Sequence, residues 1–412
     1  MSPEVSRVLA RLEARMEREA KLLRAGGAID MDRFMLPVGR EAGRLLNLLV
    51  KLGGCRRILE VGSSVGYSTV WLAEGAAANG GHVVSTESLA VKHREARDNL
   101  AEAGLLGQVE LHTGDALATI RRHAGPFDFA LIDLWKNLYV PSLRAMAPKL
   151  APGALIAADN MLVPVSARRS AGIYRRYVAG QTDLETVLVP IANGIELSRK
   201  RAGERPLAPA VRRVLERLER RSAREEAVRK SLSESEYRGR LGEFMLAIGR
   251  DSGRLLHMLV KHGRCTRILE LGTSAGYSTL WLADAAGATG GRVVSLDNQA
   301  GKHREARANL EAAGLAGRVE LITADILPAL ARLPGPFDLV LLDYTRDQYI
   351  AALEALRPKL TPGALVAADN MLQPLATRAQ AEAYRTHVAA QADLESVLVP
   401  IGNGIELTRK TA

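Results

Sequence analysis

The sequence predicts two α/β domains in tandem, each with a mainly parallel sheet that closes with an antiparallel hairpin. The chain repeats itself, since Gly62 recurs as Gly272 and Asp133 as Asp343, each 210 residues later. Within each copy, apolar strand-like runs alternate with helical stretches, which is typical of a parallel sheet covered on both faces. Each copy also ends in two strand-like runs joined around an Asn-Gly pair, the strongest short signal for a hairpin.

The length of the repeat sets the domain boundary. A period this long indicates a copied domain, because solenoid repeats run only about 20–50 residues. The chain has 412 residues, which is enough for two domains with full cores. Residues 202–209 are rich in Pro, Gly and charge and predict a linker. We expect one domain over residues 1–203 and the other over 204–412, with the linker at about 200–210.

Hydrophobic patterning places the elements of the first copy. A helix is expected at residues 4–24, and an equivalent helix at 211–231 precedes the second copy. The pattern leaves open whether these helices cover the ligand face of a sheet or simply lie on the surface. Strands are expected at residues 57–62, 82–87, 109–114, 127–133, 153–159, 184–191 and 194–200, and the last two form the hairpin.

Composition excludes several classes of protein. The apolar content of 47% and charged content of 25% are those of a globular chain. Cys55 and Cys265 occupy the same position in the two copies, just before a strand, where a buried thiol fits better than a disulfide. Neither a signal peptide nor a run of ~18 apolar residues occurs, so we expect a cytoplasmic protein that does not enter membranes.

A glycine-rich turn follows the first strand of each copy. Glycines allow a tight turn and close backbone approach, and the helix that follows favours the negative end of a ligand. The spacing E-x-G-x-x-x-G differs from the G-x-G-x-x-G of dinucleotide folds, which makes a nicotinamide oxidoreductase the weaker alternative. The candidate cofactor-binding residues of the turn are Glu60, Gly62, Gly66 and Ser68, with Glu270, Gly272, Gly276 and Ser278 in the second copy.

Acidic residues end the next two strands. Glu87 and Asp297 end the second strand of each copy, where a carboxylate can accept both hydroxyls of a ribose. Asp115 and Asp325 follow the third strand, where the edge of an adenine would lie. The turn and the ribose acid together predict a nucleoside-containing cofactor in both copies.

A second group of polar residues predicts a metal site. Asp133 ends one strand and Asp159-Asn160 ends the next, and parallel strands deliver their carboxyl ends to one edge of the sheet. An all-oxygen set suits Mg²⁺ or another hard divalent cation, whereas Asp133 alone would also fit a helix cap. The second copy offers Asp343, Asp369 and Asn370.

Lys136, three residues after Asp133, is a candidate general base. A neighbouring cation disfavours the charged form of lysine, although a surface lysine is the plainer interpretation. The second copy has Arg346 in this catalytic position, and arginine stays protonated.

Together these motifs resemble the cation-dependent, S-adenosylmethionine-dependent O-methyltransferases, the family of catechol O-methyltransferase and the plant caffeoyl-CoA enzymes. The resemblance covers nearly all of each copy and implies a seven-stranded class I methyltransferase (Rossmann-like) domain. It also implies S-adenosyl-L-methionine and Mg²⁺ as cofactors. Val38 and Ile248, where the resemblance begins in each copy, join the expected cofactor contacts.

The resemblance assigns roles to further residues. The Asp-Asp-Asn sets fall on the metal ligands of the family, and Lys136 falls on its base. Glu196 would contact the second substrate hydroxyl, with Glu406 as its counterpart. Trp135 and Pro164 match a hydrophobic gate around the catechol ring; the second copy keeps Pro374 but has Thr345 in place of the tryptophan.

The function we expect is Mg²⁺-dependent methylation of a small catechol-type aromatic, most surely by the first copy. One alternative acceptor is a hydroxylated tRNA base, which the net charge of +10 favours and the aromatic content of 4% disfavours. Another alternative makes the second copy a non-catalytic partner in an intramolecular pseudo-dimer. Whether the chain forms a further homodimer stays open.

Overall fold

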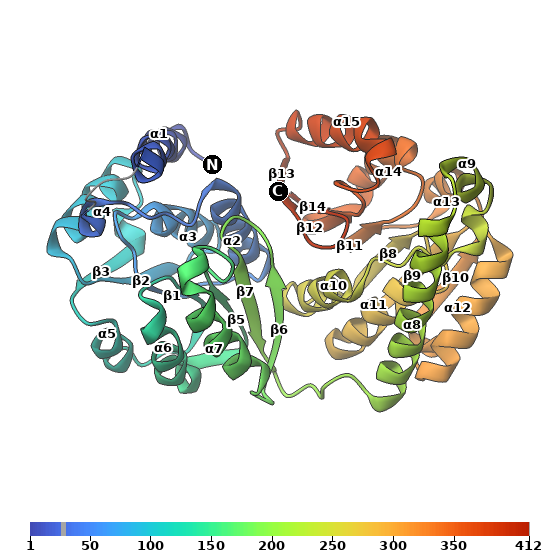
Figure 1. Cartoon of the computed structure of the whole chain (residues 1–412), viewed down its shortest axis with the longest axis horizontal. Helices are drawn as coiled ribbons and strands as arrows, with labels where there is room; N and C mark the ends of the chain where they lie inside the picture. Colours follow the sequence, from blue (N-terminus) through green and yellow to red (C-terminus); the bar gives the residue numbers. More distant parts are fainter. Residues whose placement is uncertain (26–29, 412) are drawn as a thin grey trace. The chain divides into compact units, whose positions relative to one another are not determined.

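The computed structural model describes residues 1–25 and 30–411. It divides into two compact units, Met1–Gly203 and Glu204–Ala412. Each unit contains one seven-stranded sheet (Figure 1). The fold class predicted by the repeat, the alternation of elements and the closing hairpin is confirmed.

The first unit begins with a helix and ends with the hairpin. Its helices are α1 (Pro3–Ala25), α2 (Arg40–Leu52), α3 (Tyr67–Ala78), α4 (Ala90–Glu102), α5 (Ala116–Arg122), α6 (Tyr139–Met146) and α7 (Arg168–Ala179). Its strands are β1 (Arg57–Val61), β2 (His82–Glu87), β3 (Val109–Thr113), β4 (Phe127–Ile132), β5 (Leu150–Ala158), β6 (Leu184–Val189) and β7 (Ile195–Lys200).

The second unit repeats this order and also contains the short helix α9, whose counterpart positions in the first unit lie mostly outside the described residues. Its helices are α8 (Pro209–Ser231), α9 (Glu234–Gly239), α10 (Arg250–His262), α11 (Tyr277–Thr289), α12 (Ala300–Ala313), α13 (Ile326–Arg332), α14 (Tyr349–Leu356) and α15 (Arg378–Ala389). Its strands are β8 (Arg267–Leu271), β9 (Arg292–Asp297), β10 (Val319–Thr323), β11 (Phe337–Leu342), β12 (Leu360–Ala368), β13 (Leu394–Val399) and β14 (Ile405–Lys410).

The strand order determines where a ligand can bind. The first sheet runs β3-β2-β1-β4-β5-β7-β6, and only the pairs that involve β7 are antiparallel. The order reverses direction at β1 and β4, so the carboxyl ends of these two strands flank the crevice in which open α/β sheets bind ligands. The Gly-rich turn follows β1, and Asp133 follows β4.

Two layers of helices cover the first sheet. Helices α1 to α4 contact one another, and α5 to α7 form a separate set of contacts (Figure 1). The central strands β4 and β5 are nearly continuous apolar runs, as expected for strands that are buried on both faces. Tyr139 of α6 and Tyr174 of α7 are buried in the second layer with their rings edge to face, 5.6 Å apart.

Two strand limits differ by more than one residue from those expected, and several others differ by a single residue. Strand β5 begins at Leu150, earlier than the expected residue 153, because its register against β4 shifts around Pro152 and Gly153. Strand β6 ends at Val189 because Pro190 has no N–H to continue the ladder. Within the described residues, no helix combines the length and apolar character needed to cross a membrane.

Candidate functional site

The glycine turn after β1 is pressed against the end of β4. Gly62 has a φ of 99°, and a Cβ atom added to it would lie 1.8 Å from the carbonyl oxygen of Asp133. Gly272 repeats this geometry, with a φ of 105° and a distance of 1.9 Å to the carbonyl oxygen of Asp343. Only glycine fits there, so the turn and the acid-bearing strand end form one rigid piece.

Glu60 lies beneath the turn. Its carboxylate is fully buried and accepts hydrogen bonds from the hydroxyls of Ser68, Thr69 and Ser85, each at 2.6 Å. Glu60 therefore ties the start of α3 to β1 and β2. The sequence predicted a cofactor contact here, but the buried carboxylate supports the turn from below.

The buried carboxyls of Glu60 and Glu270 should make stability depend on pH. Burial raises both pKa values from 4.5 to about 7. The folded state favours the protonated carboxyl. Its contribution to the free energy of unfolding is therefore complete below about pH 4.5 and is lost as the pH rises through about 7. Between about pH 5 and about pH 8 we expect the free energy of unfolding of each of the two domains to fall by about 3 kcal/mol in the parent chain, relative to the double variant Glu60→Gln/Glu270→Gln.

Thermal melts of both chains across this pH range measure that difference. Glu17→Gln, a change at an exposed glutamate of α1, is the control and should differ from the parent by a constant amount. If the difference in stability between the parent and the double variant did not change with pH, the pKa values of the two carboxyls would be the same in the folded and unfolded states.

The acids at the ends of β2 and β9 are fixed by backbone groups. Glu87 Oε2 accepts from the N–H of Ser64 at 2.8 Å, and its Oε1 accepts from the N–H of Leu89 at 2.9 Å. Asp297 is held in the same way by Ser274 and Gln299, at 2.8 and 2.9 Å. Glu87 Oε1 also accepts from the Ser88 hydroxyl at 3.2 Å, whereas Glu87 Oε2 and both oxygens of Asp297 keep a lone pair that can accept ribose hydroxyls.

The acids after the third strands differ between the units. Asp115 caps α5, and its Oδ1 accepts from the N–H groups of Leu117 and Ala118 at 2.6 and 3.2 Å. Asp325 does not cap α13; it lines a cavity and accepts from Asn298 at 3.3 Å. In the first unit the cap occupies one of the two carboxylate oxygens.

The three expected metal ligands of the first unit converge. The amide of Asn160 donates to Asp133 Oδ1 at 3.2 Å and to Asp159 Oδ2 at 2.6 Å. Asn160 has a φ of 60°, a left-handed conformation that asparagine tolerates and that turns its side chain back toward the two acids. In the second unit Asn370 donates to Asp343 at 2.9 Å.

The electrostatics of these sets fit a hard divalent cation. Burial raises the pKa of Asp133 and of Asp159, and repulsion from Asp133 raises that of Asp159 further. Asp159 Oδ1 and its counterpart Asp369 Oδ1 are buried and have no hydrogen-bond partner among the described residues. A divalent cation would pair these oxygens and remove the repulsion between the acids.

The closing hairpin holds the loop that carries Asn160. Leu162 and Met161 donate backbone hydrogen bonds to the carbonyls of Asn193 and Gly194, at 2.8 and 2.9 Å. In the second unit the Asn403 side chain also donates to Asn370 Oδ1 at 3.0 Å. Turn chemistry alone does not predict this contact, although the presence of the asparagine in both copies was a signal of a further role.

Lys136 lies beside the acids of the first unit. Its Nζ donates to the hydroxyl of Tyr139 and lies 4.0 Å from the centre of that ring. The Tyr139 hydroxyl in turn donates to the carbonyl of Asp159 at 3.1 Å. Burial lowers the pKa of Lys136, while the neighbouring Asp133 opposes that shift. The result is an amine that loses its proton more readily than a surface lysine.

Arg346 occupies this place in the second unit. Its Nε is buried and has no hydrogen-bond partner among the described residues. Arginine keeps its proton at any physiological pH, so this side chain can supply charge but cannot act as a base.

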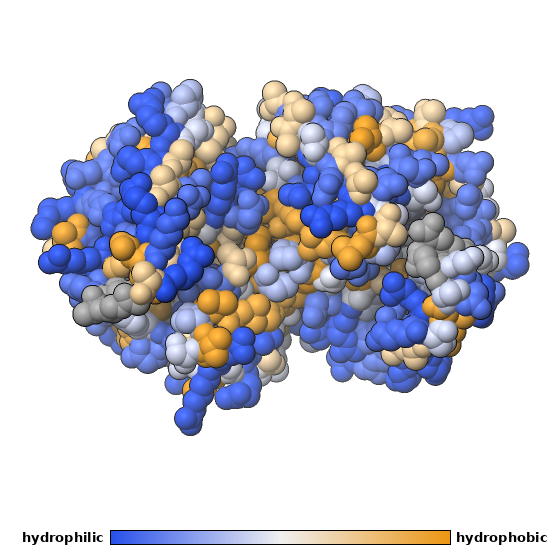
Figure 2. Space-filling view, turned by 45° about the horizontal axis from the view of Figure 1, so that its top comes forward, coloured by the Kyte–Doolittle hydropathy of each residue, from blue (hydrophilic) through white to orange (hydrophobic). Residues whose placement is uncertain are grey.

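Apolar side chains are exposed near the strand ends of the first unit. Trp135 is 64% exposed, and Val165 beside the exposed Pro164 is 66% exposed. On the face drawn in Figure 2 the surface is mostly hydrophilic, with hydrophobic side chains gathered in several places. Exposed aromatic and proline side chains next to Asp133 and Asn160 can contact the faces of a flat, apolar molecule.

Glu196 and Glu406 are placed differently from the prediction. Glu196 is buried on β7 and accepts from the Thr186 hydroxyl at 2.6 Å and from the Arg175 guanidinium at 2.8 Å. Glu406 accepts from Arg385 at 2.9 Å. Both carboxylates thus anchor a helix of the second layer, α7 or α15, and Glu406 is not among the residues that line the cavity of its unit.

A cavity of about 1320 Å³ joins the sites of the second unit. Helix α8 contributes Ser222, Glu225 and Arg229, so the helix before the sheet covers the ligand side in this unit. The expected site residues that line the cavity are Ile248, Gly272, Ser278, Asp297, Asp325, Asp343, Arg346, Asn370 and Pro374. Those that lie outside the lining are Glu270, Gly276, Asp369 and Glu406.

Three expected cofactor residues of the first unit remain, namely Val38, Gly66 and Ser68. Val38, the counterpart of Ile248, is buried. Gly66 caps α3 against Ala96 of α4 and supports the turn through helix packing. Ser68 uses its hydroxyl to bind Glu60, so Gly66 and Ser68 both support the turn.

Comparison with known proteins finds the same match in both units. The family model described as a methyltransferase domain matches residues 59–161 and 269–371. A catechol O-methyltransferase of Mycobacterium tuberculosis is 40% identical over 132 residues, 31% of this chain and 58% of that protein. A catechol O-methyltransferase of Niastella koreensis is 34% identical over 131 residues, 31% of this chain and 59% of the relative. The matched part thus spans less than two thirds of these relatives.

Plant and structural relatives give further matches. Caffeoyl-CoA O-methyltransferase 5 of Nicotiana tabacum is 27% identical over 187 residues, covering 40% of this chain and 78% of its own length. The crystal structure of an O-methyltransferase from Bacillus cereus in complex with SAH is 25% identical and covers 49% of this chain and 92% of its own, with a TM-score of 0.40.

Proposed function

Since the chain belongs to the methyltransferase-domain family, we propose that it methylates a small catechol-type aromatic with the help of Mg²⁺. The domain occurs in two tandem copies, and its relatives include O-methyltransferases. The proposal assigns turnover to the first unit. The match to two catechol O-methyltransferases supports this acceptor class, and the all-oxygen donor sets support the cation.

One observation carries the proposal. The turn for the cofactor and the site for the cation meet at Asp133, whose backbone carbonyl contacts Gly62 and whose side chain contacts Asn160. A methyl donor on the turn and an acceptor at the acids would therefore lie side by side. Holding two reactants together in this way removes much of the entropy that opposes a bimolecular transfer.

Each site residue of the first unit has a separate role in the proposed reaction. Asp133, Asp159 and Asn160 would hold the cation, and Glu87 would hold the ribose of the cofactor. A bound divalent cation lowers the pKa of acceptor hydroxyls, and S-adenosylmethionine supplies the electrophilic methyl group. Lys136 Nζ accepts the proton of the acceptor hydroxyl, since burial has already lowered its pKa.

The second unit differs in its base and its gate. It retains the glycine turn, the ribose acid and the three oxygen ligands, but Arg346 and Thr345 replace Lys136 and Trp135. We infer that it binds the cofactor and the cation with little or no methyl transfer to catechols.

Replacing Lys136 by Met should lower turnover while leaving cofactor affinity close to that of the parent. A general base contributes about 10²–10⁴-fold to rate, and methionine keeps the length of the chain without a basic nitrogen. Steady-state methyl transfer, measured in an Asp343→Ala background that silences the second unit, gives kcat and the KM for each substrate.

Lys21→Met on the exposed face of α1 is the matched control and should leave kcat unchanged. The pH-rate profile adds a second readout, because Lys136→Met should remove the basic group on which the rate depends. Equal turnover in Lys136→Met and the parent would exclude Lys136 as the base.

A further inference from the structure

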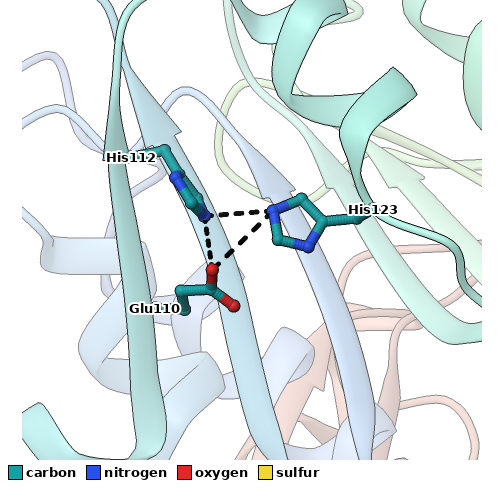
Figure 3. A group of neighbouring side chains, drawn as sticks. All are labelled: Glu110, His112 and His123. Carbon is teal, nitrogen blue, oxygen red and sulfur yellow. Dashed lines mark hydrogen bonds and ion pairs between the residues drawn. The ribbon is translucent and has the colours of Figure 1, made fainter.

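A cluster of two histidines and one glutamate lies at the sheet edge of the first unit, outside the site described above. Glu110 and His112 are alternate residues of the edge strand β3 and share one face, and His123 follows α5 (Figure 3). His112 Nε2 lies 2.9 Å from Glu110 Oε1 and 3.0 Å from His123 Nε2, and the third separation is 4.0 Å. The three donor atoms thus face a common point.

Hydrogen bonds within the cluster do not account for this geometry. A carboxylate only accepts, so the contact with Glu110 requires a proton on His112 Nε2. That nitrogen then has no lone pair for His123, and its single N–H cannot point well at two atoms that are 4.0 Å apart. The imidazole nitrogens and the carboxylate oxygen would all be satisfied as ligands of one cation.

The spacing and chemistry match a zinc site. Zn²⁺ binds imidazole and carboxylate at about 2.0–2.2 Å in tetrahedral geometry, which places its donor atoms roughly 3.3 Å apart. The three observed separations of 2.9, 3.0 and 4.0 Å bracket that value. Glu110 has a side chain that is 53% exposed, so water can reach the cluster as a fourth ligand.

The donors are held before any cation arrives. Strand pairing places His112 opposite Thr86 of β2. Lys149 Nζ donates to the carbonyls of Ile120, Arg121 and His123 at 2.7, 2.7 and 2.5 Å, and so fixes the end of α5. A preorganised set of donors binds with a smaller loss of conformational entropy.

The second unit shows what this position looks like without the histidines. Glu320 remains, but Ile322 and Leu333 replace His112 and His123 and pack against the hydrophobic core. Two apolar side chains can therefore pack stably at these positions, so packing alone does not require two histidines there. We propose that Glu110, His112 and His123 form a Zn²⁺ site that ties the edge strand β3 to the end of α5 in the first unit only.

Zinc stoichiometry of the full chain tests this proposal. The metal-free chain is dialysed against Zn²⁺ in excess Mg²⁺, which occupies the oxygen sites, and bound zinc is counted by elemental analysis. The double variant His112→Ile/His123→Leu carries the residues of the second unit, where they pack stably. We expect it to bind one Zn²⁺ fewer per chain than the parent does and to lose the thermal stabilisation that Zn²⁺ gives the parent.

The control exchanges another histidine for its counterpart. His82→Arg, at the exposed start of β2, should bind as much zinc as the parent. With Co²⁺ as the probe, the parent and His82→Arg should show the strong visible absorption of a four-coordinate site with imidazole ligands, and the double variant should not. Equal zinc stoichiometry in the parent and the double variant would overturn the proposal, as would the absence of that absorption from the parent.

Discussion

We expect the replacement of Gly62 by alanine to remove cofactor binding from the first unit and to leave the second unit unaffected. The new Cβ would lie 1.8 Å from the carbonyl oxygen of Asp133, and the residue would keep a φ of 99°. Left-handed strain and overpacking each cost about 1–3 kcal/mol, so affinity should fall roughly 100-fold or more. Calorimetric titration with S-adenosylmethionine should then detect one site per chain where the parent has two.

The control variant Gly54→Ala introduces a similar left-handed backbone strain without a steric clash, and so separates the two effects of Gly62→Ala. Gly54 has a φ of 59°, but nothing lies within 4 Å of an added Cβ, and the residue is outside the site. This variant should keep both binding sites with slightly lower stability. If Gly62→Ala also kept both sites at the affinity of the parent, the turn could not be the cofactor site.

Replacing Asp159 by asparagine should stop methyl transfer yet stabilise the chain when divalent cations are removed. Asp159 is fully buried beside Asp133, and its Oδ1 has no partner among the described residues. Asparagine removes the repulsion between the carboxyls, but it also removes a charged ligand whose loss costs several kcal/mol at the transition state, or about 10³-fold in rate. Melting curves with EDTA and with Mg²⁺, together with turnover in an Asp343→Ala background, measure both effects.

The exposed Asp98→Asn on α4 provides the control, because it removes the same charge at a surface position that is not one of the expected site residues. It should change neither turnover nor the stabilisation that Mg²⁺ gives the parent. A variant Asp159→Asn that Mg²⁺ still stabilises as much as the parent would exclude this acid as a cation ligand.

The sequence was sufficient for the fold because periodicity and turn chemistry agree along each copy. The exact limits of β2 follow from its pattern of residues, and the presence of the hairpin around Asn193-Gly194 follows from one turn. The start of β5 could not be read in this way, because the bulge at Pro152 and Gly153 lets the strand continue through residues that usually end one.

The site was predictable at the strand ends but not in the orientation of every side chain. Topology alone brings Asp133, Asp159 and Asn160 to one edge of the sheet. The direction of Glu196 depends on Arg175, a partner supplied by α7 that no local pattern indicates. The histidine cluster was missed for a similar reason, since His112 and His123 meet only when α5 packs beside β3. Comparing the copies at these positions would have drawn attention to it.

The most direct test of the central claim is methyl transfer from labelled S-adenosylmethionine to a panel of small catechols. The parent chain, Asp133→Ala and Asp343→Ala would be compared with Mg²⁺ and with EDTA. We expect transfer that requires Mg²⁺, is lost in Asp133→Ala and persists in Asp343→Ala. Transfer that persists in Asp133→Ala, or that continues after the cation is removed, would contradict a cation-dependent catechol O-methyltransferase in the first unit.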